Sequence, residues 1–255
     1  MKIYNAFFSA TNTTKTVTTE IATQMSQEVH HFNLTNQALQ ATVQIPSDAL
    51  LLVGMPVYGG RIPQVAAASL AQFQGQQTPA ILVAVYGNRE YEDALVEMQD
   101  ILEANGFYIL AAGTFIAQHS IFPRTAQGRP DAADHLQIKD FAQRCVEKWK
   151  SIDGQKPQQL CLPGNRPYKT PGKIPLQMVT DARCTACGAC ARMCPVGAIP
   201  ADRPQFTDPE KCIHCGRCQL VCSAHARHYK GLLYTVAGAV FGWKNRKRKE
   251  PEFFL

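Results

Sequence analysis

Eight of the ten cysteines in this 255-residue chain stand in two copies of one spacing, C-x2-C-x2-C-x3-C. The copies contain Cys184, Cys187, Cys190 and Cys194, and then Cys212, Cys215, Cys218 and Cys222. A glycine lies between the second and third cysteines of each copy, Gly188 in the first and Gly216 in the second. A residue without a Cβ lets the backbone bend closely around a bound group. The rest of the chain is organised around this repeat.

The spacing suits a cubane [4Fe-4S] cluster. Three thiolates two residues apart can bind three corners of the cube from one tight loop, whereas the fourth corner lies beyond the reach of that loop. Zinc is one alternative, but its ligands usually come as two separated pairs. Disulfides are another, but they need an oxidising compartment, and residues 1–8 contain no long apolar secretory segment or cleavage site. The sequence therefore predicts two [4Fe-4S] clusters.

This pattern resembles the bacterial two-cluster ferredoxins over about residues 175–229, in the number, spacing and repetition of the cysteines. In those proteins the fourth cysteine of each run binds the cluster of the other run. The resemblance thus implies two ligand sets, set A with Cys184, Cys187, Cys190 and Cys222, and set B with Cys194, Cys212, Cys215 and Cys218. One departure is Ser223, which follows the second run where Pro195 follows the first. It removes no ligand.

The cysteines also divide the chain, because residues 1–144 contain none. We predict a first domain at 1–150, a proline-containing linker at 151–174, the cluster domain at 175–229, and an apolar and basic tail at 230–255. An apolar fraction of 45% and a charged fraction of 18% are typical of globular domains. Cys145 and Cys161 lack ligand spacing, which favours structural roles.

The first domain alternates apolar stretches with helical ones. Strands are predicted at residues 2–8, 28–34, 49–53, 80–86 and 107–115, with helices following the first, third, fourth and fifth of them. This order predicts an α/β fold, a flavodoxin-like doubly wound parallel sheet of five strands, with a small α+β two-cluster ferredoxin domain behind it. In open sheets of this kind a ligand lies beyond the carboxyl ends of the strands.

The loops at that end of the predicted sheet have unusual compositions. Residues 9–16 place small hydroxyl side chains before a helix N-terminus, which favours a bound phosphate. A turn that only caps the helix is the alternative. Residues 54–63 and 87–93 combine glycine with tyrosine, which can present an aromatic ring to a flat ligand.

These loops resemble those of the flavodoxins, and the likeness spans residues 1–150. It implies bound FMN, with contacts from Ser9, Thr11, Asn12, Thr13, Thr14, Pro56, Val57, Tyr58, Gly59, Gly87, Asn88 and Tyr91. The residues up to Thr14 would hold the phosphate, and Tyr58 and Tyr91 would lie near the ring. Asn12 replaces a common glycine, but asparagine tolerates the left-handed conformation. His119 follows the fifth strand and either contacts the flavin edge or substrate, or is satisfied locally.

The formal charge of +6 does not indicate a nucleic-acid partner. An oxidised cubane with four thiolates carries about −2, and an FMN phosphate adds about −2 more, so the cofactors would cancel the excess. Five positive residues also lie together in the tail, at 244 and 246–249. The apolar segment 231–243 before them is shorter than the roughly 20 residues of a membrane-spanning helix. It either packs on the protein or docks weakly on a membrane surface or partner.

The two halves together resemble the ferredoxins with an N-terminal flavodoxin-like domain. This resemblance implies a cytoplasmic electron-transfer protein that relays electrons between FMN and two [4Fe-4S] clusters to a redox partner protein. The alternative is a flavin-dependent oxidoreductase that reduces a small molecule such as a quinone or nitro compound. No acid-base pair or nucleophile constellation stands out, and a G-x-G-x-x-G nicotinamide fingerprint is missing, which favours the carrier. A redox sensor is a third interpretation, but no DNA-binding element is recognisable.

Overall fold

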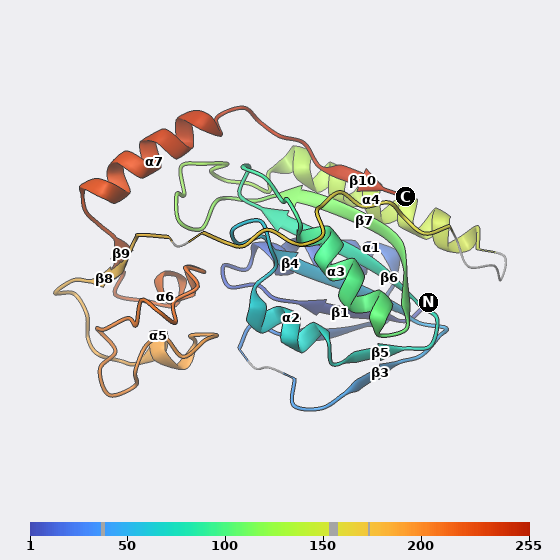
Figure 1. Ribbon diagram of the computed structural model, residues 1–255, viewed down its shortest axis with the longest axis horizontal. Helices are drawn as coiled ribbons and strands as arrows, with labels where there is room; N and C mark the ends of the chain where they lie inside the picture. Colours follow the sequence, from blue (N-terminus) through green and yellow to red (C-terminus); the bar gives the residue numbers. More distant parts are fainter. Residues whose placement is uncertain (37–38, 153–157, 173) are drawn as a thin grey trace.

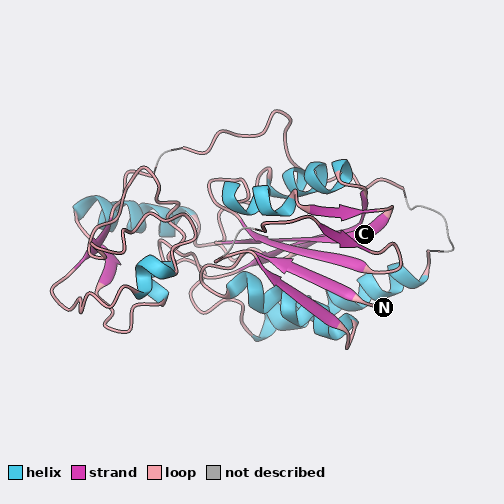
Figure 2. Cartoon of the chain, turned by 90° about the horizontal axis from the view of Figure 1, so that it is seen from below, coloured by secondary structure: helices cyan, strands magenta, loops and turns pink. Residues whose placement is uncertain are grey.

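The computed structural model describes residues 1–36, 39–152, 158–172 and 174–255. A larger lobe holds a sheet with helices on both faces, and a smaller lobe with the clustered cysteines lies beyond one end of that sheet (Figures 1 and 2). The larger lobe contains β1 (Ile3–Phe7), α1 (Thr13–Met25), β2 (Val29–Asn33), β3 (Val43–Ile45), β4 (Leu50–Pro56), α2 (Gln64–Leu70), β5 (Phe73–Gly75), β6 (Thr78–Tyr86), α3 (Ala94–Ala104), β7 (Phe107–Ile116) and α4 (Ala132–Lys150). The remaining elements are β8 (Met178–Thr180), α5 (Ala189–Arg192), α6 (Arg217–Leu220), β9 (Arg227–Tyr229), α7 (Leu232–Lys244) and β10 (Glu252–Phe254).

The main sheet has the order β10-β7-β6-β4-β1-β2, and every neighbouring pair from β7 to β2 is parallel. Numbered among themselves along the chain, these five parallel strands run 2-1-3-4-5 across the sheet. This is the strand order of the flavodoxin-like doubly wound fold, whose ligand crevice lies where the order reverses. The predicted α/β fold class of the first domain is therefore confirmed.

The prediction of a five-stranded, wholly parallel sheet is wrong. A sixth strand, β10, comes from the C-terminal tail and pairs antiparallel with β7 through Phe253 and Gly113. The ring of Phe253 lies 4.9 Å from that of Phe141 on α4 and 5.8 Å from that of Phe115 on β7. Pairing and aromatic packing together hold this short strand at the edge of the sheet.

Two short strands were not expected from the sequence. β3 and β5 pair parallel beside the main sheet, with Val43 opposite Phe73. β5 occupies the end of a segment predicted to be helical, because α2 stops at Leu70 and Phe73 is fully buried in the core. Strands this short carry too few residues for their alternation to be recognised.

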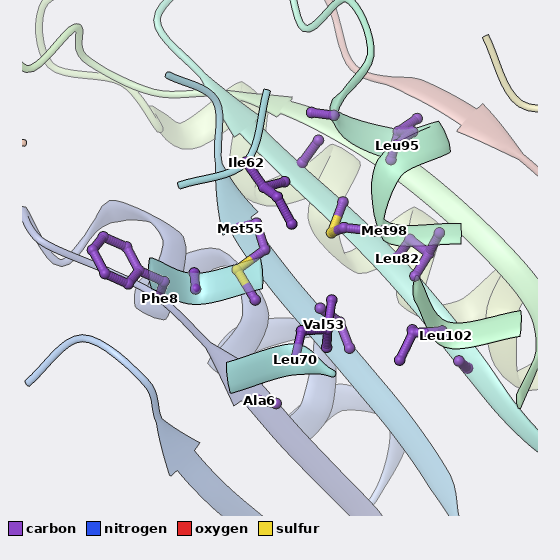
Figure 3. Close-up of a cluster of buried hydrophobic side chains, with 14 of the residues drawn as sticks. Ala6, Phe8, Val53, Met55, Ile62, Leu70, Leu82, Leu95, Met98 and Leu102 are labelled. Carbon is purple, nitrogen blue, oxygen red and sulfur yellow. The ribbon is translucent and has the colours of Figure 1, made fainter. Parts of the chain in front are cut away.

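The core has two layers, because successive strand residues point to opposite faces of the sheet. In β4, Leu51 and Val53 pack toward α2 and α3, whereas Leu50 and Leu52 pack toward α1 and α4. Figure 3 shows the first of these layers, formed by Ala6, Phe8, Val53, Met55, Ile62, Leu70, Leu82, Leu95, Met98 and Leu102. A strand buried on both faces requires the nearly continuous apolar runs found in β4 and β6.

The described part of the predicted linker, residues 158–172, runs along α3. The Asp93 carboxylate accepts hydrogen bonds from the backbone N–H of Asn165 at 2.8 Å and of Lys169 at 2.6 Å. About two turns further along, Asp100 pairs with Arg166 and accepts a hydrogen bond from the hydroxyl of Tyr168. These contacts fix the path of the chain from the larger lobe to the cysteines.

The smaller lobe is a folded repeat joined by β8 and β9, which pair antiparallel. The two cysteine runs adopt matching backbone conformations. Gly188 and Gly216 have φ angles of 72° and 76°, and Ala186 and His214 have φ angles of 54° and 53°. Each run thus makes the same left-handed turns before a single helical turn, α5 or α6. None of the helices within the described ranges is long and apolar enough to cross a membrane.

Candidate functional site

One pocket of the smaller lobe is lined by four cysteines drawn from both runs. They are the members of set B, Cys194, Cys212, Cys215 and Cys218. Burial raises the pKa of the Cys215 thiol to about 12 and that of the Cys218 thiol to about 11. Thiols in such a place give up their protons when a cationic core takes the position of the protons. Within the described ranges no group of His, Cys, Asp or Glu side chains converges on a single ion, and the donors of set B surround a space instead.

A buried cation stands beside this pocket. Arg227 is only 4% exposed. It donates hydrogen bonds to the Thr207 hydroxyl at 2.6 Å, to the Phe206 carbonyl at 3.3 Å and to the Pro204 carbonyl, all of which are neutral. Its Nε has no partner among the described residues. A buried guanidinium needs an anion close by. A thiolate-bound [4Fe-4S] cluster carries negative charge, so this orphaned donor fits the predicted group.

Backbone groups aimed at sulfur repeat in the two runs. The N–H of Ala198 donates to Cys194 Sγ, and the N–H of Ala226 donates to Cys222 Sγ, each at 3.3 Å. Ser223, in place of a second proline, leaves this turn unchanged. Hydrogen bonds to the ligand sulfurs influence the reduction potential of a cluster. Cys194 and Cys222 each accept one such bond, so this influence is the same in kind at both positions.

Set A lies nearer the surface. Cys190 is buried, Cys184 and Cys222 are half-buried, and Cys187 is exposed. The pKa of Arg183 is raised mainly by its hydrogen bond with Asp181 and also by the nearby Cys222 thiol. Cys222 is thus near enough to Arg183 to influence its pKa, and the convergence of the four set A cysteines on one cluster stays a prediction.

A second pocket lies at the carboxyl ends of the parallel strands of the main sheet. Of the residues implied as FMN contacts, its lining contains Thr11, Thr13, Thr14, Pro56, Val57, Tyr58 and Gly87. The side chain of Asn12, the N-cap of α1, makes no capping hydrogen bond. The N–H groups of Thr13 and Thr14 at the start of α1 and three hydroxyls thus form a donor set that suits a phosphate, whereas the N–H of Lys15 donates to Ser9. The residues present fit FMN.

Three other implied contacts serve the loops themselves. Ser9 Oγ accepts the N–H of Lys15 at 3.0 Å, and Ser9 N–H donates to Thr35 at 2.7 Å. Asn12 takes the left-handed conformation with φ 67°, as its residue type allows. Gly59 has φ 63° and faces Pro171, leaving 3.1 Å for an added Cβ. Their contact with FMN stays a prediction.

Asn88 and Tyr91 are engaged by the C-terminal segment. The Asn88 amide donates to the carbonyls of Asn245 at 2.8 Å and Lys247 at 2.9 Å, and the Tyr91 hydroxyl donates to Glu252 at 2.8 Å. Neither side chain belongs to the lining of the second pocket. The tail thus holds the loop after β6, and contact of these two side chains with FMN also stays a prediction.

His119 lines the second pocket beside Gly87. Its Nδ1 accepts the backbone N–H groups of Ile121 and Phe122, both at 3.1 Å. The ring therefore carries its proton on Nε2. Burial, helped by Arg89, lowers the pKa of His119 from 6.5 to about 4. The histidine is satisfied locally, and it lines the pocket predicted to bind FMN, but its contact with a flavin or substrate stays a prediction.

We expect His119 to make the fold sensitive to acid. Its pKa is lowered in the folded chain, so the unfolded chain binds a proton more readily. The stability it contributes is fully present above pH 6.5 and is lost as the pH falls toward about 4. Urea unfolding followed across this range should show a smaller decline for His119→Gln than for the wild type. Parallel curves for the two proteins would contradict the assignment.

The two pockets adjoin each other. Gly216, inside the second cysteine run, faces Thr11 and Ser120, whose atoms would lie 3.4 Å and 3.6 Å from an added Cβ. Arg217 Nη1 donates to the Ala10 carbonyl at 3.2 Å. Burial raises the pKa of the Tyr58 hydroxyl, and the nearby Cys215 raises it further. The loop that carries three ligands of set B therefore rests on the loop predicted to hold the FMN phosphate.

Sequence reasoning missed Arg217 and Arg227. Arg217 follows Gly216 in the second cysteine run, whereas Ala189 follows the matching Gly188 in the first run. That difference between the two copies was a readable signal, but it did not reveal a partner in the other domain. Arg227 carries no signal of its own, because only burial distinguishes it from a surface arginine.

Comparison with known proteins agrees with this geometry. Residues 183–226 match the model of the 4Fe-4S dicluster domain family. "Ferredoxin 7Fe" of Hydrogenibacillus schlegelii is 31% identical over 67 residues, which are 26% of this chain and 78% of that protein. The set B pocket and the repeated turns lie within the matched residues.

Solved structures resemble the larger lobe. A flavodoxin of Streptococcus pneumoniae TIGR4 is 14% identical, with a TM-score of 0.41, over 58% of this chain and 99% of that one. An archaeal flavodoxin is 15% identical, with a TM-score of 0.41, over 59% and 99%. An apo NADH:FMN oxidoreductase is 15% identical, with a TM-score of 0.44, over 60% and 93%. The match of the cysteine repeat and the likeness to the Hydrogenibacillus schlegelii ferredoxin show that the chain belongs to the ferredoxin family. Its 4Fe-4S dicluster domain follows a flavodoxin-like sheet.

Proposed function

We propose that this protein carries electrons between a bound FMN, two [4Fe-4S] clusters and a redox partner protein. The observation that supports this most strongly is the contact of the set B loop with the predicted phosphate loop, through Gly216 and Arg217. When bound, FMN takes up two electrons and releases them singly, and each cluster carries one electron. Electron transfer needs cofactors held close together and shielded from water, and this contact provides both.

Some of these residues would bind the cofactors, and others would lie between them or balance their charge. Thr11, Thr13 and Thr14 would bind the phosphate at the start of α1, and Tyr58 would stand between the flavin position and Cys215. The cysteines of set B would hold the cluster nearer the flavin. Arg227 would balance its charge, because it lies beside Cys212 and Cys218 and offsets part of the effect of burial on both thiols.

Set A would hold the cluster nearer the partner. Its exposed member Cys187 offers the shortest route from a cluster to another protein. Cys190 Sγ of set A lies 3.6 Å from the Pro204 carbonyl oxygen, which also accepts a hydrogen bond from the Arg227 guanidinium. Because Arg227 lies beside set B, this carbonyl brings the two sets close together. The proposed order is therefore flavin, set B, set A and partner. The proposal includes a cytoplasmic location, because cluster ligands and free cysteines both persist where thiols are kept reduced.

Anaerobic purification with iron, sulfide and flavin measured on one sample tests the cofactor content. We expect about eight iron, about eight sulfide and about one FMN per chain. Turnover assays then separate carrier from enzyme. Rapid exchange with a ferredoxin partner and no specific turnover of quinones or nitro compounds supports the carrier, whereas specific turnover of such a compound supports a flavin-dependent oxidoreductase. Zinc without sulfide would refute the cluster assignment.

The phosphate loop allows a direct test of flavin binding. Thr11→Ala combined with Thr13→Ala removes two hydroxyls that line the pocket. Hydrogen bonds to charged groups contribute about 1.5–3 kcal/mol each, so we expect the Kd for FMN to rise by at least about tenfold. Quenching of flavin fluorescence measures this Kd. Thr23→Ala, an exposed threonine of α1 that bonds its own helix, is the matched control. Riboflavin lacks the phosphate and should bind both proteins equally.

A further inference from the structure

The helix α7 has an inner face that is firmly packed. The Tyr234 hydroxyl donates to the Ile121 carbonyl at 3.0 Å, and its ring stacks on Phe122 at 5.6 Å. Phe241 lies 5.0 Å from Phe122, ring to ring, and Gly238 faces the same phenylalanine. These contacts orient the helix, so its opposite face is held outward.

The outward face is apolar along the whole helix. The large side chains on it are between 48% and 80% exposed, and they are Leu232, Leu233, Val236, Val240 and Trp243. At about 3.6 residues per turn, these positions fall within roughly 100° of one another. Figure 1 shows α7 at the periphery of the molecule. A continuous apolar strip of this kind marks an interaction surface.

The charges around the strip have one sign. Residues 232–249 contain no Asp or Glu. Lys244, Arg246 and Lys247 are exposed just after the strip, and Lys230 is exposed just before it. The Arg246 guanidinium lies 5.2 Å from the Trp243 ring. An occupant of this surface must therefore combine an apolar layer with negative charge.

We propose that α7 docks the protein on an anionic lipid surface. Bilayers offer acyl chains for the apolar strip and headgroup phosphates for the basic residues at both ends of it. Tryptophan and arginine together are typical of the boundary between these layers. The helix would lie in the plane of the membrane, since its inner face stays on the protein.

Vesicle flotation tests this proposal on the full-length holoprotein. The probes are vesicles of phosphatidylcholine alone and of an equal mixture with phosphatidylglycerol. We expect the wild type to float with the anionic vesicles. The double variant Leu232→Glu/Val236→Glu puts two carboxylates on the strip and should reduce the bound fraction at least about tenfold, because two apolar side chains are lost from the contact and the new carboxylates are repelled by anionic headgroups. Both positions are exposed, so the fold should tolerate the change.

Two further measurements separate docking from misfolding. Leu136→Glu alters an exposed leucine of α4, 68% exposed, and should float like the wild type. In a Trp149→Phe background, the emission of Trp243 should shift to the blue with anionic vesicles. Wild-type protein that stays unbound to both vesicle types, or floats as well with both Glu replacements, would overturn the proposal. Strong capture by a purified acidic protein without any flotation would likewise overturn it.

Discussion

Cys215→Ala is expected to leave the protein with about four of its roughly eight irons and to disconnect the flavin from the remaining cluster. Cys215 is 8% exposed and belongs to set B, and its loop is the one that contacts the phosphate loop. The cluster held by set A would remain, but in the proposed order it follows the set B cluster and does not adjoin the flavin. Iron analysis, low-temperature EPR and anaerobic stopped-flow reoxidation of the reduced flavin measure these effects.

The matching variant is Cys187→Ala, which removes an exposed ligand of set A. It should also lose about four irons, yet its flavin should still pass electrons to the set B cluster while transfer to an external ferredoxin fails. Cys161→Ala, an exposed cysteine outside both sets, should behave as the wild type. Equal flavin reoxidation in the two ligand variants would refute the proposed order, even if both clusters exist as expected.

Asp134→Ala is expected to lower the free energy of unfolding by about 3–5 kcal/mol. Asp134 and Arg129 are 2% and 6% exposed, and Arg129 Nε donates to Asp134 at 2.8 Å. Without the carboxylate, the guanidinium of Arg129 stays buried and unpaired. The change also removes the capping box of α4, because Asp134 accepts the backbone N–H of Asp131 at 2.8 Å. Urea unfolding of the loaded protein measures the loss.

Asp140→Ala on the same helix is the control, since its pair with Arg144 is exposed and 3.9 Å long. Such surface pairs contribute about 0–1 kcal/mol. The effect of Asp134→Ala should also extend to the tail, because Arg129 Nη1 donates to the Lys249 carbonyl at 2.7 Å. Faster proteolysis of residues 245–255 in this variant would show that release. A loss no larger than that of Asp140→Ala would mean that the buried pair is not needed.

Much of this architecture can be read from local patterns. Cysteine spacing is local, because three ligands of each set come from one loop of seven residues. The spacing therefore predicted the three set B members of the second run, the resemblance to two-cluster ferredoxins implied Cys194 as the fourth, and all four do line one pocket. Strands β4 and β6 were equally legible, since burial on both faces demands continuous apolar runs. Loops after parallel strands meet at one edge of the sheet, which explains why Thr11, Tyr58 and Gly87 line one pocket.

Other features depend on residues far apart in the chain. β10 is three residues long and pairs with β7, which lies more than a hundred positions earlier in the chain. A strand this short has no recognisable alternation of apolar and polar residues in the sequence. Asn88 looked like a flavin-loop residue, but its amide binds the carbonyls of Asn245 and Lys247. By itself, the sequence determined the paired cysteine runs of one half and the alternating strands and helices of the other, because ligand spacing and strand alternation act over a few residues. Only the tertiary structure decided that the set B loop rests on the phosphate loop and that the tail returns to the sheet, because such pairings depend on the burial and complementarity of distant surfaces.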